Sequence, residues 1–365
     1  MNKIAEIWDR VERSLFPHLR ECLPEMTEMH LHLATVLEVI RIEDHVPPCW
    51  MQWYGRRRKD RKAVARAFVA KVVHKMPTNK ALIERLHVDK NLRALCGWEY
   101  AGQVPDKSTF TRAFAEFART GLLDQVHEAL VKHHLGDVTV WHVSRDSTAI
   151  EAREKPVCKQ KNSKQERPKG KRGRPKKGEE RSVTEQKRLV RQRKQTAQEA
   201  IAELPTACDI GTKVDAKGHK MSWCGFKLHL DVVDGDIPTL AVTTSASLHD
   251  SQPAIPMGKV TAERVTSWYD LMDSAYDAKE IHEASRELGH VPIIDVNRRR
   301  GKAAPMESDR ARRYRHRSSA ERVNARLKDD CGGRNVRVRG APKVHTHLMF
   351  GVLVIFAEAI LALAP

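Results

Sequence analysis

The sequence predicts an α/β protein, in which a helical N-terminal region precedes a mixed sheet flanked by helices. Up to about residue 135, apolar side chains recur with the helical period. From Asp137 onward, short β-branched and aromatic runs alternate with helical ones. The chain has 365 residues, 41% of them hydrophobic, which is enough for two domains and a sizeable core. We therefore expect a helical domain over residues 1–135 and an α/β domain over residues 136–365.

The N-terminal helices are read from apolar spacing and from helix-breaking residues. Residues 62–76 place apolar side chains at helical spacing and end at Pro77. One continuous helix is predicted over 79–95. A third helix begins near Asp106, and either Asp106 or Ser108 can cap it, while a fourth covers 121–134. Short helices joined by turns fit either a helix-turn-helix DNA reader or a plain helical bundle, and the spacing leaves both open.

Strand character begins in the second half of the chain. The first strand is expected to end at residues 144–146, and Asp234-Gly235 predicts a hairpin turn. Further helices are expected over 278–288 and 309–328. The predicted strands cover residues 138–143, 221–233, 237–244, 267–272 and 291–295. A basic insert over 153–205 follows the first strand and is expected to be a loop with one helix near 183–202.

The C-terminal run 348–365 resembles a membrane span, but it contains Glu358. A carboxylate inside a bilayer is costly, so a buried helix packed on the sheet is the preferred interpretation. The N-terminus has no uninterrupted apolar stretch typical of a signal peptide. The seven cysteines include no C-x-x-C pair, which argues against a zinc finger and a disulfide scaffold. We expect a cytoplasmic protein with no membrane partner.

The positive charge is concentrated in two segments. The formal net charge is +18, and residues 153–199 carry 18 Lys and Arg against 6 Asp and Glu. Residues 298–339 carry 15 Lys and Arg against 5 Asp and Glu. Exposed like charges repel unless a polyanion neutralises them, and nucleic acid is the commonest large polyanion. The alternative for each segment is a solvated tail or linker.

Three acids are candidates for catalysis. Asp146 and Asp273 each end a predicted strand, and Glu321 lies in a predicted helix. Carboxylates that converge in one cleft repel each other unless a cation lies between them. Ligation by oxygen alone favours Mg²⁺ or Mn²⁺ over zinc, and two such ions suit attack on a phosphodiester. The three acids are therefore the predicted metal ligands.

The helix around Glu321 is predicted to carry a polar stripe. On a continuous helix, Tyr314, Arg317, Glu321 and Lys328 share one face. Val323 and Leu327 point to the opposite face as an apolar anchor. Arg317 and Lys328 could hold phosphates, and Tyr314 could stack on a sugar or base. The alternative is a surface helix with ordinary i,i+4 ion pairs.

A resemblance favours the catalytic interpretation. The segment YRHRSSAERVNARLK matches Y-x2-R-x3-E-x6-K at every fixed position. This signature resembles that of bacterial insertion-sequence transposases of the DDE class, of the IS-four/IS-five type superfamily. VSRDSTAIEA resembles the strand carrying the first Asp of that family, and LMDSAYDAKEI resembles its D-x-x-Y segment. The resemblance covers roughly residues 30–360.

The resemblance implies an RNase-H-like core, which the pattern alone could not distinguish from other α/β sheets. It implies that Asp146, Asp273 and Glu321 bind two Mg²⁺ or Mn²⁺ ions. It also implies nicking of transposon ends by water and attack of the freed 3′-hydroxyl on target DNA. The expected partners are double-stranded DNA, as terminal inverted repeats and as target, and a second copy of the chain in a dimer formed on DNA. A nuclease with the same triad, and a non-catalytic DNA-binding relic, are the alternatives.

Two further sites are suggested. Arg172, Arg174, Lys176 and Lys177 belong to an R-G-R-P segment that resembles an AT-hook, a minor-groove binder. A nonspecific basic linker fits that segment equally well. The pair His249-Asp250 could lie near the three acids, although a structural hydrogen bond at a strand end is the expected role.

Overall fold

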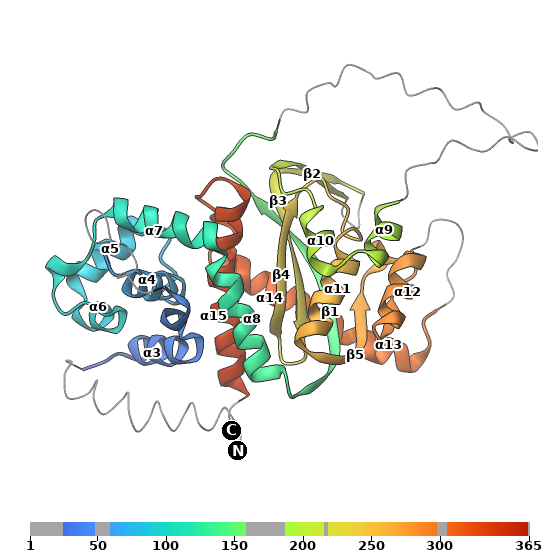
Figure 1. The fold of residues 1–365 in the computed structure, drawn as a ribbon, viewed down its shortest axis with the longest axis horizontal. Coiled ribbons are helices and arrows are strands. Elements are labelled where there is room, and N and C mark those ends of the chain that lie inside the picture. Colours follow the sequence, from blue (N-terminus) through green and yellow to red (C-terminus); the bar gives the residue numbers. More distant parts are fainter. Residues whose placement is uncertain (1–24, 48–58, 158–186, 215–217, 298–304, 364–365) are drawn as a thin grey trace, which may run out of the picture.

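The computed structural model describes residues 25–47, 59–157, 187–214, 218–297 and 305–363. Helices α3 to α8 lie on one side in Figure 1, next to the C-terminal helix α15, and a sheet flanked by helices lies beyond. The fold is a mixed α/β structure with a helical N-terminal region, as the sequence predicts.

The N-terminal region is built from short capped helices. They are α3 (Glu28–Ile40), α4 (Arg61–Val73), α5 (Asn79–Val88), α6 (Lys90–Cys96), α7 (Lys107–Thr120) and α8 (Leu122–Leu135), with the 3₁₀ helices η2 (Ile42–His45) and η4 (Ala101–Gln103). The single helix predicted over 79–95 is wrong. Asp89 is extended, and its carboxylate accepts the Leu92 N–H at 3.0 Å, so it begins a new helix.

The sheet has six strands. They are β1 (Thr139–Glu151), β2 (Asp209–Val214), β3 (Lys220–Val233), β4 (Ile237–Ser245), β5 (Thr266–Met272) and β6 (Val291–Ile294). The order is β2-β3-β1-β5-β6, with β4 paired to β3. β3 is antiparallel to its neighbours, whereas β1, β5 and β6 are parallel to one another.

The first strand is longer than predicted. It was expected to end at 144–146, but it continues to Glu151 because β3 pairs with it as far as Glu151 opposite Gly225. Asp146 therefore lies inside the strand and not at its end. The hairpin predicted at Asp234-Gly235 is confirmed, and Gly235 takes the left-handed conformation (φ 80°) that the turn requires. Strand β2 was not predicted.

Helices cover both faces of the sheet. They are α9 (Arg188–Lys194), α10 (Ala197–Ala202), α11 (Ala254–Arg264), α12 (Lys279–Glu287), α13 (Ser308–Tyr314), α14 (Ser318–Asp329) and α15 (Ala341–Ala362), with the 3₁₀ helices η5 (Ser274–Tyr276) and η6 (Arg315–Arg317). The single helix predicted over 309–328 is wrong, since η6 separates α13 from α14. Tertiary contacts hold this turn: the Ser144 hydroxyl donates to the His316 carbonyl at 3.1 Å.

The described end of the basic insert is packed on the α/β domain. Two short helices, α9 and α10, replace the one helix expected there. The Lys259 ammonium donates to the carbonyl oxygens of Gln192, Arg193 and Gln195, at 2.9, 3.0 and 2.6 Å. These bonds satisfy carbonyl oxygens at the C-terminal end of α9 and hold this helix against α11.

The C-terminal helix is buried, as predicted. α15 is the one helix among the described residues that is long and apolar enough to cross a membrane, but 78% of its apolar window is inside the protein. It packs on β4 and on α3, α4, α7 and α8, so one apolar core joins the N-terminal helices to the sheet. The Glu358 carboxylate of this helix lies 2.7 Å from His32 Nε2 and also pairs with Arg326.

Candidate active site

Parallel pairing of β1 and β5 brings the first two predicted acids together. Arg145 lies opposite Met272, so the next residues along the two strands, Asp146 within β1 and Asp273 directly after β5, lie at the same level. Asp273 also begins η5, where its carboxylate accepts the Ala275 N–H at 2.9 Å. Along β1 the side chains alternate. Arg145 points toward α11, where it shares Asp231 with Thr261, whereas Asp146 points toward α14.

Burial disfavours the ionised form of both carboxylates. Burial raises the pKa of Asp146 to about 6, and the nearby charge of Asp273 adds to the rise. Burial also raises the pKa of Asp273, with a further contribution from Asp250. The positive charges of Arg317 and Lys213 oppose both shifts. These two positive charges do not cancel the rise in either pKa, so the acid pair is suited to a bound cation.

Helix α14, which carries the third predicted acid, contacts the first acid. Asn324 is buried on this helix and donates its amide to Oδ2 of Asp146 at 3.1 Å. Glu321 lies one turn earlier, and its carboxylate forms an ion pair with Arg317. Arg317 is the link between the acids, because its charge acts on Asp146 and Asp273 as well as on Glu321.

The three carboxylates do not form a closed cluster. Within the described part of the chain, the three metal-ligating side chains whose donor atoms all lie within 4.8 Å of one another are His142, Asp234 and His316. Glu321 is half-exposed and is engaged by Arg317. To bind a cation together with Asp146 and Asp273, the Glu321 carboxylate would have to release Arg317. The role of Glu321 as a metal ligand therefore stays a prediction.

The predicted polar stripe is only partly continuous. Tyr314 and Arg317 lie together, with the Arg317 guanidinium 5.7 Å from the Tyr314 ring centroid. Lys328 lies further along α14, where burial lowers its pKa and the charges of Arg334 and Lys213 lower it further. Val323 and Leu327 are buried, which confirms the apolar anchor on the opposite face.

Lys213 is a site residue that the sequence analysis missed. It belongs to β2, and its charge acts on Asp146, on Asp273 and on Lys328. Its charge therefore acts both on the acid pair and on the far end of the signature helix. Because β2 was not recognised as a strand, no signal in the sequence placed Lys213 near the acids.

Asp250 approaches the acid pair from the other face of the sheet. Its Oδ1 lies 2.8 Å from the Lys227 ammonium, which also donates to the Leu248 carbonyl at 2.7 Å. Although burial opposes ionisation, hydrogen bonds from Lys227 and Ser147 lower the pKa of Asp250. The expectation of a structural hydrogen bond is confirmed, and the negative charge of Asp250 also reaches Asp273.

Tyr276 is a further buried residue on which the charges of these acids act. Its ring is buried, and its hydroxyl has no hydrogen-bond partner among the described residues. Burial raises its pKa, and the charges of Asp250, Asp146 and Asp273 raise it further. A buried hydroxyl without a partner is costly, so this position favours a polar ligand beside the acids.

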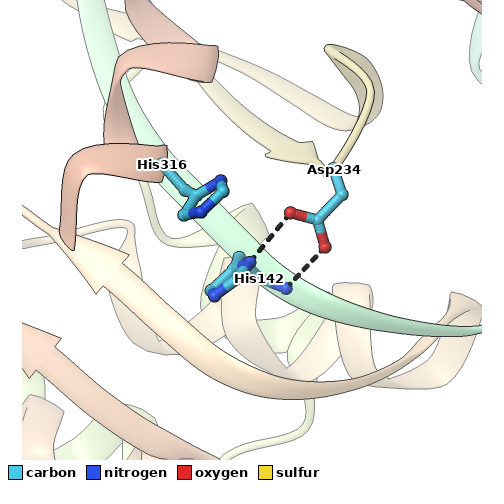
Figure 2. A group of neighbouring side chains, drawn as sticks. All are labelled: His142, Asp234 and His316. Carbon is cyan, nitrogen blue, oxygen red and sulfur yellow. Dashed lines mark hydrogen bonds and ion pairs between the residues drawn. The ribbon is translucent and has the colours of Figure 1, made fainter. Parts of the chain in front are cut away.

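A stacked histidine pair joins the first strand to the signature segment (Figure 2). His142 Nδ1 lies 2.8 Å from Asp234 Oδ1, and the His316 ring stacks on His142 with centroids 4.5 Å apart and planes at 7°. Nitrogen lone pairs of parallel rings lie in separate planes and do not converge. The arrangement is therefore a stack that holds η6 over β1, although its donor atoms are close enough to count as a candidate metal group.

The residues fit a divalent cation through their chemistry. Asp146 and Asp273 offer hard oxygen donors that are partly buried and insufficiently neutralised. The predicted AT-hook residues, Arg172, Arg174, Lys176 and Lys177, lie outside the described residues.

Comparison with known families agrees with this geometry. The family model described as Transposase DDE domain matches residues 141–357, more than half of the chain. A second model, described as Transposase domain (DUF772), matches residues 18–116. No curated protein and no solved structure matches the chain. The matched range of the first model contains both acids of the pair and all of α14. The chain therefore belongs to the transposase family defined by the DDE domain.

Proposed function

We propose that this transposase, of the IS-four/IS-five type, hydrolyses a phosphodiester at transposon ends and joins the freed 3′-hydroxyl to target DNA. Membership of the family implies a DNA substrate and a divalent metal. The proposed ligands are Asp146, Asp273 and Glu321, holding two Mg²⁺ or Mn²⁺ ions. The observation that carries the proposal is the juxtaposition of Asp146 and Asp273 on parallel strands, with both pKa values raised.

The chain's own residues would bind and orient the DNA. A bound divalent cation supplies charge compensation and activates the attacking hydroxyl group. Arg317 would move from Glu321 to a phosphate oxygen, which its planar guanidinium can hold through two hydrogen bonds. Tyr314 would pack against the adjacent sugar. Lys213 and Lys328, at the far end of α14, would hold a phosphate on the other side of the reacting bond.

The N-terminal helices are proposed to recognise the transposon end. The match to a second transposase domain over residues 18–116 supports this assignment. Two ends are processed in one event, so two active sites are required, and we propose a dimer formed on DNA. The basic segment containing Arg172 and Arg174 would add sequence-independent affinity.

Cleavage by substituted proteins tests the assignment. The substrate is a duplex carrying the inverted repeat that flanks this gene, incubated with Mg²⁺. Asp146→Asn, Asp273→Asn and Glu321→Gln should each reduce cleavage to background while DNA binding is retained. Glu203→Gln is the matched control, because Glu203 is an exposed acid of the same half of the chain. Normal cleavage by Glu321→Gln would remove Glu321 from the site.

Joining of precut ends tests the second step. A duplex with a free 3′-hydroxyl at the transposon end should be inserted into a plasmid in the presence of Mg²⁺. Cleavage of uncut ends without any joined product would identify a nuclease and contradict strand transfer. Absence of both activities in the wild-type protein, with DNA binding retained, would identify a relic.

A further inference from the structure

An arginine-lined groove lies beside the signature segment. It has a volume of about 530 Å³ and is formed by α13, the end of α12 and the start of β6. Its charged walls are Arg286, Arg310, Arg312 and Arg313, against one acid, Asp309. We propose that this groove binds the phosphate backbone of target DNA. The proposal rests on the proposed function and names a surface for one of its two DNA substrates.

Three of the four arginines lie on α13, and Arg286 lies at the end of α12. Arg310 donates to the Pro292 carbonyl at 2.8 Å, which anchors α13 to β6. The Arg313 guanidinium lies 4.2 Å from the ring centroid of Tyr269, and this cation–π contact supports it from below. Arg312 is exposed and has only a long contact, 3.4 Å, to Asp309. Four arginines against one aspartate therefore leave the groove with three positive charges that it does not itself neutralise.

The chain segment from Arg313 to Arg317 runs from the groove toward the acid pair. Arg313 precedes Tyr314, and Arg317 follows in η6, where its charge reaches Asp146 and Asp273. A DNA strand held by the arginines of α13 would therefore be directed toward the acids.

Its position favours target DNA over the transposon end. β6 is the edge strand of the sheet, and α13 lies on the side away from the N-terminal helices, which pack around α15 (Figure 1). A duplex in the groove would leave the N-terminal helices free for the transposon end. Arginine contacts to phosphate carry no base-sequence information, which suits a target duplex better than the fixed inverted repeat at a transposon end.

The test compares two triple variants of the full chain. The first is Arg286→Gln/Arg310→Gln/Arg312→Gln. The control is Lys132→Gln/Lys279→Gln/Lys343→Gln, which removes the same charge from exposed positions outside the groove and outside both basic segments. Binding to a random-sequence duplex is measured against salt concentration. The groove variant should make the negative slope of log K against log salt less steep, by about 0.9 for each lost phosphate contact. The control variant should leave the slope unchanged.

Activity measurements identify which DNA the groove holds. The groove variant should lose roughly tenfold in joining precut ends to a plasmid, while cleavage of uncut ends falls by less than about twofold. Equal loss of both activities would overturn the assignment to target DNA. A salt slope equal to that of the control variant would overturn DNA binding by the groove. Arg312→Glu alone, at a mostly exposed side chain, repeats the test where folding is not at issue.

Failure of the proposed function gives a different result. If the wild-type protein neither cuts nor joins DNA in Mg²⁺, the transposition chemistry is wrong. The salt slopes of the two variants still report whether the groove contacts phosphates, because they require binding alone.

Discussion

The amide of Asn324 donates to Oδ2 of Asp146 at 3.1 Å, and this bond joins helix α14 to strand β1 at the first acid. Asn324 is buried and follows Glu321 by one helical turn. The bond therefore sets the height of Glu321 relative to Asp146. Two residues 178 positions apart in the chain are thus coupled at the centre of the site.

Asn324→Asp should make the stability of the protein depend on divalent metal. A second carboxylate beside Asp146 adds repulsion and removes a hydrogen bond, which should cost about 1–3 kcal/mol of unfolding free energy in EDTA. Mg²⁺ should restore part of this loss, because a cation neutralises the added charge. Thermal unfolding with EDTA and with Mg²⁺ measures the difference. Asn324→Ala, which adds no charge, should gain no more from Mg²⁺ than the wild-type protein. A gain in Asn324→Ala as large as that in Asn324→Asp would contradict the argument.

Lys213→Gln should shift metal binding and DNA binding in opposite directions. Removing a cation near Asp146 and Asp273 leaves the acids more negative, so Mn²⁺ should bind roughly two- to fivefold more tightly. The same change should weaken binding of DNA by a similar factor. Calorimetric titration with Mn²⁺ and a DNA-binding assay check the two signs. Lys220→Gln, at the start of the neighbouring strand, is the control, and a matching effect there would disprove a specific role for Lys213.

Asp250→Asn should lower both stability and activity. It leaves the mostly buried Lys227 ammonium without its carboxylate, which should cost about 2–3 kcal/mol of unfolding free energy. Lys227→Met/Asp250→Asn removes the unpaired charge and should recover most of the stability. If Asp250 also acts on the acid pair, DNA cleavage stays low in this double variant. Recovery of cleavage together with stability would limit Asp250 to a structural role.

The pair of His345 and Asp124 should stabilise the fold in a pH-dependent way. His345 Nε2 lies 2.8 Å from Asp124 Oδ1; burial opposes protonation, but the Asp124 carboxylate raises the pKa of His345 above 6.5. A raised histidine pKa means that the stabilisation is complete below about pH 6.5 and is lost as pH rises through the folded-state value. His345→Gln should therefore cost about 1 kcal/mol near pH 6 and less at higher pH.

Denaturant unfolding of the wild-type protein and of His345→Gln at several pH values measures this difference. Thr243→Val removes the neutral contact on the other ring nitrogen, at 2.9 Å, and should not change the pH dependence. A constant difference between wild type and His345→Gln across the range would show that the ion pair does not contribute.

Local patterns in the sequence determined most elements of the fold. The apolar period predicted α4, α7 and α8, and the turn residues Asp234-Gly235 predicted the hairpin between β3 and β4. The spacing of Val323 and Leu327 predicted the buried side of α14. These features depend on which face of a helix or strand is buried, and that information is carried by residues a few positions apart.

Only the tertiary structure decided how the site is composed. Parallel pairing of β1 with β5 placed Asp146 beside Asp273, although 127 positions separate them, and β2 brought Lys213 to the same acids. The stack of His316 on His142 accompanies the break of the signature helix at η6. The alternation of apolar residues fixes a buried face but not its partner. Strand pairing, and the charges that it brings together, therefore arise from contacts between distant segments.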